Sequence, residues 1–227
     1  MKKYAVIVAG GSGQRMGTSE PKQFLELAGK PVLLHTLDCF LGTYTDLQII
    51  LVLPAAFQEQ GSALIQSLPA ADRIQITVGG ETRFHSVQNG LQLVTEPSVI
   101  WVHDAVRCLV SSELIQACYE QALRKGSAIP AVAATDSIRI QTGETHQVAD
   151  RKQVRIIQTP QTFLSNILLP AFKQSYREDF TDEATVVEAM GQPVFLIEGS
   201  YDNIKITRPV DLLIATSILA AKQSKEA

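Results

Sequence analysis

The strongest constraint on the fold is a regular alternation between short apolar runs and longer amphipathic segments. Five runs rich in Val and Ile are too short for helices and are bounded by turn residues, as buried strands are: 4–10, 47–54, 73–79, 98–104 and 127–134. Helical patterns lie between them, over 31–43, 55–68, 81–94 and 111–126. This order predicts an α/β fold with a Rossmann-like, mostly parallel sheet and helices on both faces. Ligands of such folds bind at the carboxyl ends of the strands.

Residues 136–151, DSIRIQTGETHQVADR, interrupt this alternation. Ile138 and Ile140 alternate with polar residues and TGE supplies a turn, so we expect a β-hairpin arm within one domain that spans 1–227. A hairpin with so little apolar surface does not fold alone, and it must lie against its own domain or reach a partner chain. The elements expected downstream are helices over 164–175 and 182–190, short strands over 193–199 and 202–206, and a final helix from Pro209.

Composition limits which binding partners and which cellular compartment we expect for this protein. The formal net charge of −3 gives no reason to expect nucleic acid, and no stretch approaches the roughly 18 apolar residues of a membrane span. Cys39, Cys108 and Cys118 show no C-x-x-C spacing, which argues against a zinc cage or a redox motif. An odd number of cysteines fits a reducing compartment, and the N-terminal apolar run is too short for a signal peptide. We therefore expect a cytoplasmic protein with no nucleic-acid or membrane partner.

A glycine-rich loop follows the first predicted strand. Residues 9–24 read AGGSGQRMGTSEPKQF and carry two cations, Arg15 and Lys22. The glycine spacing fits neither the dinucleotide fingerprint G-x-G-x-x-G nor the P-loop. Glycines let main-chain N–H groups approach a phosphate closely, and the two cations suit its charge, so the loop predicts a phosphate site. The alternative is a tight strand-to-helix turn with two solvated cations.

This loop resembles that of the nucleotidyltransferases, and four further segments extend the resemblance. In chain order they are GGETRFHSVQNGL (79–91), VHDAVRCL (102–109), QTPQTF (158–163) and DNIKIT (202–207). Together they resemble the cytidylyltransferases for 2-C-methyl-D-erythritol 4-phosphate, a family of the non-mevalonate isoprenoid pathway. The resemblance covers essentially the whole chain. Val106 and Cys108 depart from the family pattern H-D-A-A-R-P, which affects loop geometry rather than chemistry.

The resemblance implies a set of functional residues, a cofactor and a partner chain. The catalytic cations would be Arg15, Lys22 and Lys205. The nucleotide, CTP, would be bound by Ala9, Gly10, Gly11, Gly13, Gly80, Glu81, Ser86, Asp104 and Ala105. The polyol phosphate would be bound by Asp104, Arg107, Ser137, Arg151, Thr159 and Thr181. Mg²⁺ would be held mainly by the CTP phosphates, with Asp104 as a candidate ligand. The arm would form a homodimer in which Arg151 grips the substrate phosphate of the other subunit.

Several alternatives stay open at this point. Asp104 could end its strand as a turn or cap residue, Thr181 could cap a helix, and Lys205 could pair with Asp202. His103 points away from Asp104 on a strand and is expected to be structural. At the level of the whole chain, the rivals are a ribitol 5-phosphate cytidylyltransferase, a CMP-sugar synthetase and a catalytically silent nucleotide-binding module.

Overall fold

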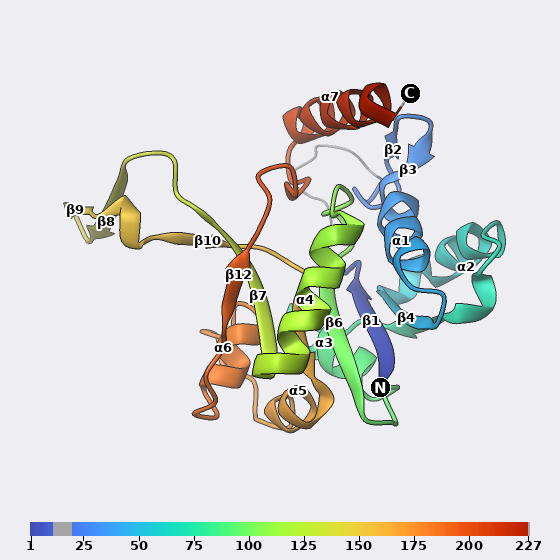
Figure 1. Ribbon diagram of the computed structural model, residues 1–227, viewed down its shortest axis with the longest axis horizontal. Helices are drawn as coiled ribbons and strands as arrows, with labels where there is room; N and C mark the ends of the chain where they lie inside the picture. Colours follow the sequence, from blue (N-terminus) through green and yellow to red (C-terminus); the bar gives the residue numbers. More distant parts are fainter. Residues whose placement is uncertain (11–19, 227) are drawn as a thin grey trace.

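The computed structural model describes residues 1–10 and 20–226. Its centre is an eight-stranded sheet in the order β10-β7-β11-β6-β1-β4-β5, with β12 beside β7 (Figure 1). The strands are β1 Lys2–Val8, β4 Leu47–Leu53, β5 Ile74–Val78, β6 Ser98–Asp104, β7 Ser127–Ala133, β10 Arg155–Ile157, β11 Gln161–Leu164 and β12 Leu196–Glu198. Each of the five apolar runs forms one of the long strands, as predicted.

The sheet is mostly parallel. Strand β1 pairs in parallel with β4 and β6, β4 with β5, and β12 with β7. Strand β11 runs antiparallel between β6 and β7, and β10 runs antiparallel beside β7. The carboxyl ends of β1, β4, β5 and β6 therefore share one edge of the sheet.

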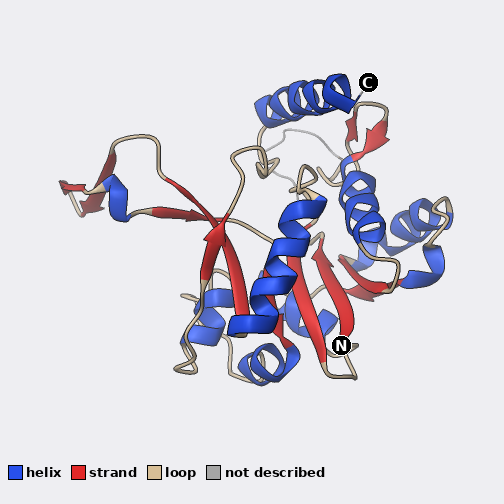
Figure 2. Cartoon of the chain, viewed as in Figure 1, coloured by secondary structure: helices blue, strands red, loops and turns tan. Residues whose placement is uncertain are grey.

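Helices cover both faces of the sheet (Figure 2). They are α1 Val32–Thr43, α2 Gln58–Gln66, α3 Arg83–Leu91, α4 Ser112–Lys125, α5 Ser165–Ala171, α6 Glu183–Glu188 and α7 Pro209–Glu226. Successive side chains of a strand point to opposite faces, so Ile7 packs with α1 and α4 while Val6 packs with α3 and α5. A smaller apolar cluster joins α7 to the two-stranded sheet of β2 (Glu26–Leu27) and β3 (Lys30–Pro31). The predicted α/β class is confirmed.

Local signals fix several helix ends. The Ser111 side chain accepts a hydrogen bond from Leu114 N and starts α4, and Gly126 ends it with a φ of +89°. Thr82 caps α3 in the same way by accepting from His85 N. Helix α7 begins at Pro209, as predicted. None of the helices in the described part of the chain is both long and apolar enough to cross a membrane.

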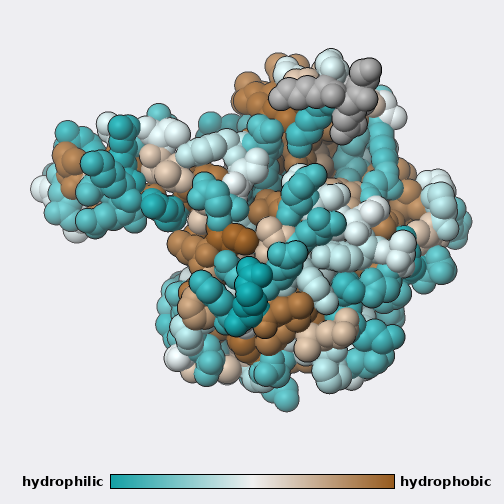
Figure 3. All heavy atoms as spheres, viewed as in Figure 1, coloured by the Kyte–Doolittle hydropathy of each residue, from teal (hydrophilic) through white to brown (hydrophobic). Residues whose placement is uncertain are grey.

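The predicted hairpin is present as a separate two-stranded sheet. Strand β8 (Ile138–Thr142) pairs antiparallel with β9 (Thr145–Ala149), and Gly143 takes a φ of +60° in the turn. The hairpin stands away from the body of the molecule, and most of its residues are exposed (Figures 1 and 3). Of its apolar side chains, Ile140 is 51% exposed and Val148 is 71% exposed.

One expectation about the second half of the chain was wrong, and two other features differ from the prediction or were missed. Residues 202–206 do not form a strand; instead Ile206 is buried under α7, and its N–H bonds to Val106 O at 2.9 Å. The alternation of Ile204 and Ile206 therefore reflects packing against a loop rather than sheet pairing. Helices α5 and α6 are shorter than expected, and the short strands β10 and β11 were not predicted.

Candidate active site

The candidate site lies where three parallel strands end. Ala9 and Gly10 follow β1, Gly80 and Glu81 follow β5, and Asp104 is the last residue of β6. Because these strands run in the same direction, their final residues meet at one edge of the sheet. The sequence placed its nucleotide candidates at this edge, and the structure brings Gly10, Gly80 and Asp104 to it.

The glycine-rich loop is described only in part. The candidates that lie outside the described residues are Gly11, Gly13 and Arg15. After this gap, Gln23 Nε2 donates a hydrogen bond to Ala9 O at 2.8 Å. That bond holds the turn containing Lys22 against the end of β1. Lys22 is largely buried there, with 9% of its surface exposed.

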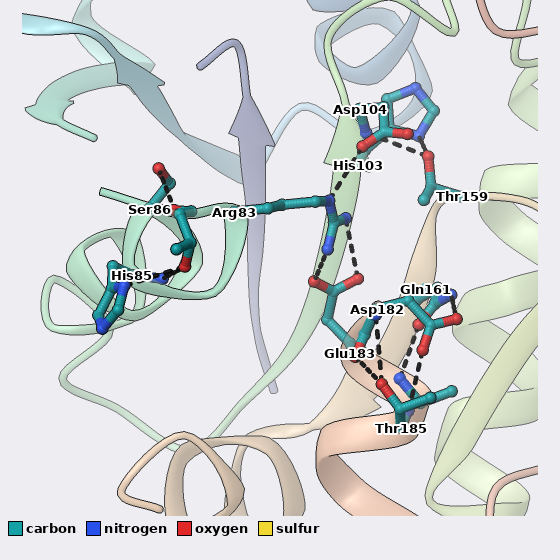
Figure 4. Close-up of polar contacts among 12 residues, drawn as sticks. Arg83, His85, Ser86, His103, Asp104, Thr159, Gln161, Asp182, Glu183 and Thr185 are labelled. Carbon is teal, nitrogen blue, oxygen red and sulfur yellow. Dashed lines mark hydrogen bonds and ion pairs between the residues drawn. The ribbon is translucent and has the colours of Figure 1, made fainter. Parts of the chain in front are cut away.

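A first cavity, of about 250 Å³, opens between the end of β1 and the turn that starts α3. Its lining residues are Val8, Gly10, Gly80, Glu81, Thr82, Arg83, Ser86 and Lys205. The Ser86 hydroxyl fixes this turn, because it accepts from Gly80 N at 3.1 Å and donates to Thr82 O at 3.0 Å (Figure 4). Ala105 is buried and does not line this cavity, but its N–H bonds to the O of Val8, a lining residue, at 3.0 Å.

A second cavity, of about 200 Å³, lies on the other side of Arg83 and Lys205. Its lining residues are Arg83, Asp104, Arg107, Ile157, Gln158, Thr159, Gln161, Thr181, Asp182 and Lys205. Arg83 and Lys205 line both cavities, so the two spaces meet at these cations. Four residues expected to bind the second substrate (Asp104, Arg107, Thr159 and Thr181) share this cavity.

Asp104 is the electrostatic centre of the junction. Its carboxylate lies 2.8 Å from Lys205 Nζ, 3.3 Å from Arg83 Nε and 3.6 Å from Arg107 Nε. Burial alone would raise the pKa of Asp104, but the three cations outweigh it and hold the pKa well below its usual range. Asp104 is therefore ionised, and it orients cations rather than ending a strand as a cap. Lys205 pairs with it, and the described residues show no ion pair between Lys205 and Asp202.

Thr159 and His103 support this carboxylate from behind. The Thr159 hydroxyl accepts a hydrogen bond from Asp104 N at 3.1 Å and lies 3.0 Å from His103 Nδ1 (Figure 4). His103 is fully buried, and its Nε2 lies 3.2 Å from Arg107 O. Burial lowers the pKa of His103 to about 3, so the ring is neutral and its Nε2–H donates to that carbonyl. His103 is structural, as its strand position indicated.

Sequence reasoning missed the ion pair between Arg83 and Glu183. Arg83 Nη1 lies 2.5 Å from Glu183 Oε1, and Arg83 Nη2 lies 3.1 Å from Glu183 Oε2. Glu183 has no exposed surface, although it is the first residue of α6. No spacing rule connects residues this far apart in the chain. A signal did exist, because a carboxylate in the first turn of a short apolar helix needs a cation when it is buried.

The cap of α6 is Asp182 rather than Thr181. The Asp182 carboxylate accepts from Thr185 N at 2.9 Å, and the Thr185 hydroxyl accepts from Asp182 N at 3.2 Å, which completes a capping box. Gln161 holds the same turn by accepting from Ala184 N at 2.9 Å. The cap interpretation of Thr181 was wrong, and this exposed residue lines the second cavity instead.

Five described candidates line neither cavity. Ala9, Lys22 and Ala105 lie close to the end of β1, and the other two belong to the arm. Ser137 and Arg151 lie at the base of the arm, and both are exposed. Arg151 Nη1 donates to Thr135 O at 2.7 Å, which fixes its guanidinium to the same strand connection. Neither residue lines a cavity described above.

Comparison with known proteins agrees with this arrangement. Residues 4–221 match the family model of 2-C-methyl-D-erythritol 4-phosphate cytidylyltransferase. A protein of that name from Bacteroides thetaiotaomicron is 46% identical over 96% of this chain and 100% of its own length. The one from Geobacillus kaustophilus is 36% identical over 99% and 100%. The crystal structure of 4-diphosphocytidyl-2C-methyl-D-erythritol synthase from Anaerococcus prevotii superposes with a TM-score of 0.83 at 26% identity, covering 96% of this chain and 98% of the other.

Fold, site and relatives together define an enzyme of the nucleotidyltransferase class. Within that class, the chain belongs to the 2-C-methyl-D-erythritol 4-phosphate cytidylyltransferase family.

Proposed function

We propose that this enzyme transfers the CMP group of CTP to 2-C-methyl-D-erythritol 4-phosphate, giving 4-diphosphocytidyl-2-C-methyl-D-erythritol and pyrophosphate. The observation that carries the proposal is the pair of cavities that meet at Arg83 and Lys205. CTP occupies the cavity between β1 and α3, and the polyol phosphate occupies the cavity beside Thr159 and Thr181. The reacting phosphates then meet at the junction, which is the proximity that a direct transfer requires.

The chemistry needs no protein nucleophile. A phosphate oxygen of the polyol substrate attacks the α-phosphorus of CTP in line with the leaving group. A new P–O bond forms while the bond from the α-phosphorus to the bridging oxygen breaks, and pyrophosphate departs with that electron pair. Both substrates are anions, so they repel each other until cations intervene. The described junction supplies three cations and two carboxylates, an excess of one positive charge where negative charge accumulates.

The roles of individual residues follow from this geometry. Lys205 contacts the α-phosphate, and Asp104 holds the ammonium group in place at 2.8 Å while offering an oxygen to a substrate hydroxyl. Arg107 contacts the polyol phosphate from the second cavity. Arg15 and Lys22 stabilise the transition state and the leaving pyrophosphate. Gly10, Gly80, Glu81 and Ser86 surround the nucleotide in the first cavity.

Magnesium is proposed to enter with the nucleotide. The described residues contain no cluster of three or more His, Cys, Asp or Glu that could hold a metal ion. Asp104 already has cations at both carboxylate oxygens, so it fits a direct Mg²⁺ ligand poorly. Mg²⁺ held by the nucleotide would supply positive charge that neutralises part of the phosphate charge.

The arm supports a further proposal, that the enzyme is a homodimer, and the cysteines support a cytoplasmic location. Two apolar side chains of the hairpin, Ile140 and Val148, are more than half exposed, although they suit a buried interface. Arg151 and Ser137 at the base of the arm would then reach the partner's second cavity. The three cysteines are free rather than paired, which fits a reducing compartment.

A subunit-mixing experiment tests the shared site. The variants Arg151→Ala and Lys205→Ala are each expected to be nearly inactive. In a mixed dimer, one site combines the intact Lys205 of one subunit with the intact Arg151 of its partner. Random exchange should therefore restore about a quarter of wild-type turnover. Failure to restore activity, with subunit exchange shown by light scattering and tagged subunits, would contradict the shared site.

A pyrophosphate-release assay tests the function itself. CTP is supplied with 2-C-methyl-D-erythritol 4-phosphate, ribitol 5-phosphate or a sugar acid in turn. Turnover is expected with the first substrate alone. Activity only with ribitol 5-phosphate or with a sugar acid would identify the corresponding rival enzyme, and activity with none of the three would indicate a silent nucleotide-binding module.

A further inference from the structure

Glu183 is a buried carboxylate for which the reaction described above has no direct use. Its exposed fraction is zero, and Arg83 takes both of its oxygens. Burial raises the pKa of this carboxyl, and the adjacent guanidinium opposes that rise. A charge buried so completely is costly, and apolar residues of similar size often give equal stability in such places.

The start of α6 does not depend on Glu183. The capping box of Asp182 and Thr185 satisfies the first turn, and Gln161 accepts from Ala184 N. Glu183 therefore contributes its carboxylate to Arg83 rather than to its own helix. The contact joins α6, on the side of the polyol-phosphate cavity, to α3, on the side of the nucleotide cavity.

Arg83 divides its donors between two carboxylates. Its terminal nitrogens, Nη1 and Nη2, go to Glu183, and only Nε faces Asp104 Oδ1, at 3.3 Å (Figure 4). The other oxygen of Asp104, Oδ2, is then available to Lys205 at 2.8 Å, while Arg107 Nε lies farther from it, at 3.6 Å. Arginine pairs best with a carboxylate through two parallel hydrogen bonds. Without a carboxylate at position 183, the guanidinium would turn to take both oxygens of Asp104 and compete with Lys205.

We propose that Glu183 is a positioning residue for the transfer reaction: by occupying the terminal nitrogens of Arg83, it reserves Asp104 for Lys205 and keeps Arg83 between the two substrates. The inference rests on the proposed function for its kinetic consequences. Its structural consequence, the arrangement of Arg83 and Asp104, stands independently of which polyol phosphate is used.

The principal test is Glu183→Gln, which keeps the size of the side chain and removes its charge. We expect kcat to fall about 10- to 100-fold, as for a displacement of about 1 Å at a reacting centre, while KM for CTP changes little. Glu183→Asp, which keeps the charge, should recover part of kcat. In a Lys205→Ala background, Glu183→Gln should have almost no further effect, because the cation it protects is absent.

Thr185→Ala is the matched control. Thr185 belongs to the same turn of α6, and its hydroxyl serves the capping box rather than either cavity. This variant should lower the melting temperature and leave kcat within about twofold of wild type. The proposal is wrong if Glu183→Gln and Thr185→Ala lose kcat in the same proportion to their fall in melting temperature. It is equally wrong if Glu183→Gln keeps the kcat of the wild type. It is also wrong if neither Glu183→Gln nor Glu183→Asp folds, since the role is then structural.

A crystal structure of Glu183→Gln gives a readout that does not depend on activity. Arg83 is expected to place Nε and a terminal nitrogen on both oxygens of Asp104, with Lys205 displaced. An unchanged arrangement overturns the inference even if the wild-type enzyme is active. A wild-type enzyme that is inactive in the pyrophosphate assay refutes the proposed function instead.

Discussion

The sharpest steric prediction concerns Gly80, at the turn between β5 and α3. A methyl group added there would lie 2.4 Å from His85 Cβ and 2.9 Å from His85 C. Non-bonded carbon atoms stand about 3.5–4.0 Å apart, so Gly80→Ala must displace the turn by about 1 Å. The helix cannot easily yield, because Thr82 and Ser86 hold its first turn. The displacement should open the bond between Gly80 N and Ser86 Oγ and deform the nucleotide cavity.

Steady-state kinetics measure the consequence. A misplacement of about 1 Å can cost about 100-fold, so kcat/KM for CTP should fall by that order while KM for the polyol phosphate changes little. The control is Gly42→Ala in α1, where the added methyl group meets no atom within 4 Å. It should stabilise the fold by up to about 1 kcal/mol and leave the kinetics unchanged. If kcat/KM for CTP is unchanged in Gly80→Ala, the assignment of this cavity to the nucleotide is refuted.

Two further predictions concern a catalytic cation and a helix start. Lys22→Ala should lower kcat by orders of magnitude with its circular dichroism spectrum unchanged, and near-normal kcat would remove Lys22 from the mechanism. Asp211 accepts hydrogen bonds from Thr207 N, Thr207 Oγ1 and Arg208 N at 2.7–2.9 Å, so Asp211→Ala should cost about 1–2 kcal/mol of unfolding free energy. Burial would raise the pKa of Asp211, but these bonds lower it below its ordinary 3.8; the stabilisation is therefore complete above that pH and is lost as the pH falls through the lowered pKa. In urea titrations, the difference in unfolding free energy between wild type and Asp211→Ala should be smaller at pH 3 than at pH 7. An equal difference at both pH values would contradict the role of the ionised Asp211 carboxylate.

The sequence predicted the elements whose pattern is strong and local. Long apolar runs became β1, β4, β5, β6 and β7, and a Ser cap with a Gly stop marked α4. The failures are short elements whose state depends on distant partners. Strand β11 has four residues and follows Pro160, so only its two neighbours in the sheet make it a strand. Residues 202–206 have the alternation of apolar and polar residues that is typical of a strand, but they pack against the loop after β6 instead of pairing with a strand.

The candidate site likewise contains some features that the sequence predicted and others that depend on distant partners. Motifs placed Gly80 and Asp104 at strand ends and Ser86 in the helix that follows Gly80, and the topology brought these segments together. The partner of Glu183 could not be read from the sequence, because its pairing with Arg83 depends on how α6 docks against β11. The sequence left open whether Thr181 caps α6 or contacts substrate, and the cap is its neighbour Asp182, because both residue types cap helices and the backbone conformation decides between them.

The position of β11 has a consequence for synthesis. All the sheet neighbours of β7, namely β10, β11 and β12, come later in the chain than β7 itself. A nascent chain that has emerged only to residue 150 therefore exposes an unpaired edge on β6 and two on β7. Open edges of this kind recruit other chains. Fragments ending before Gln161 should accumulate as aggregates, whereas those ending near Thr207 already contain every strand and should stay dispersed.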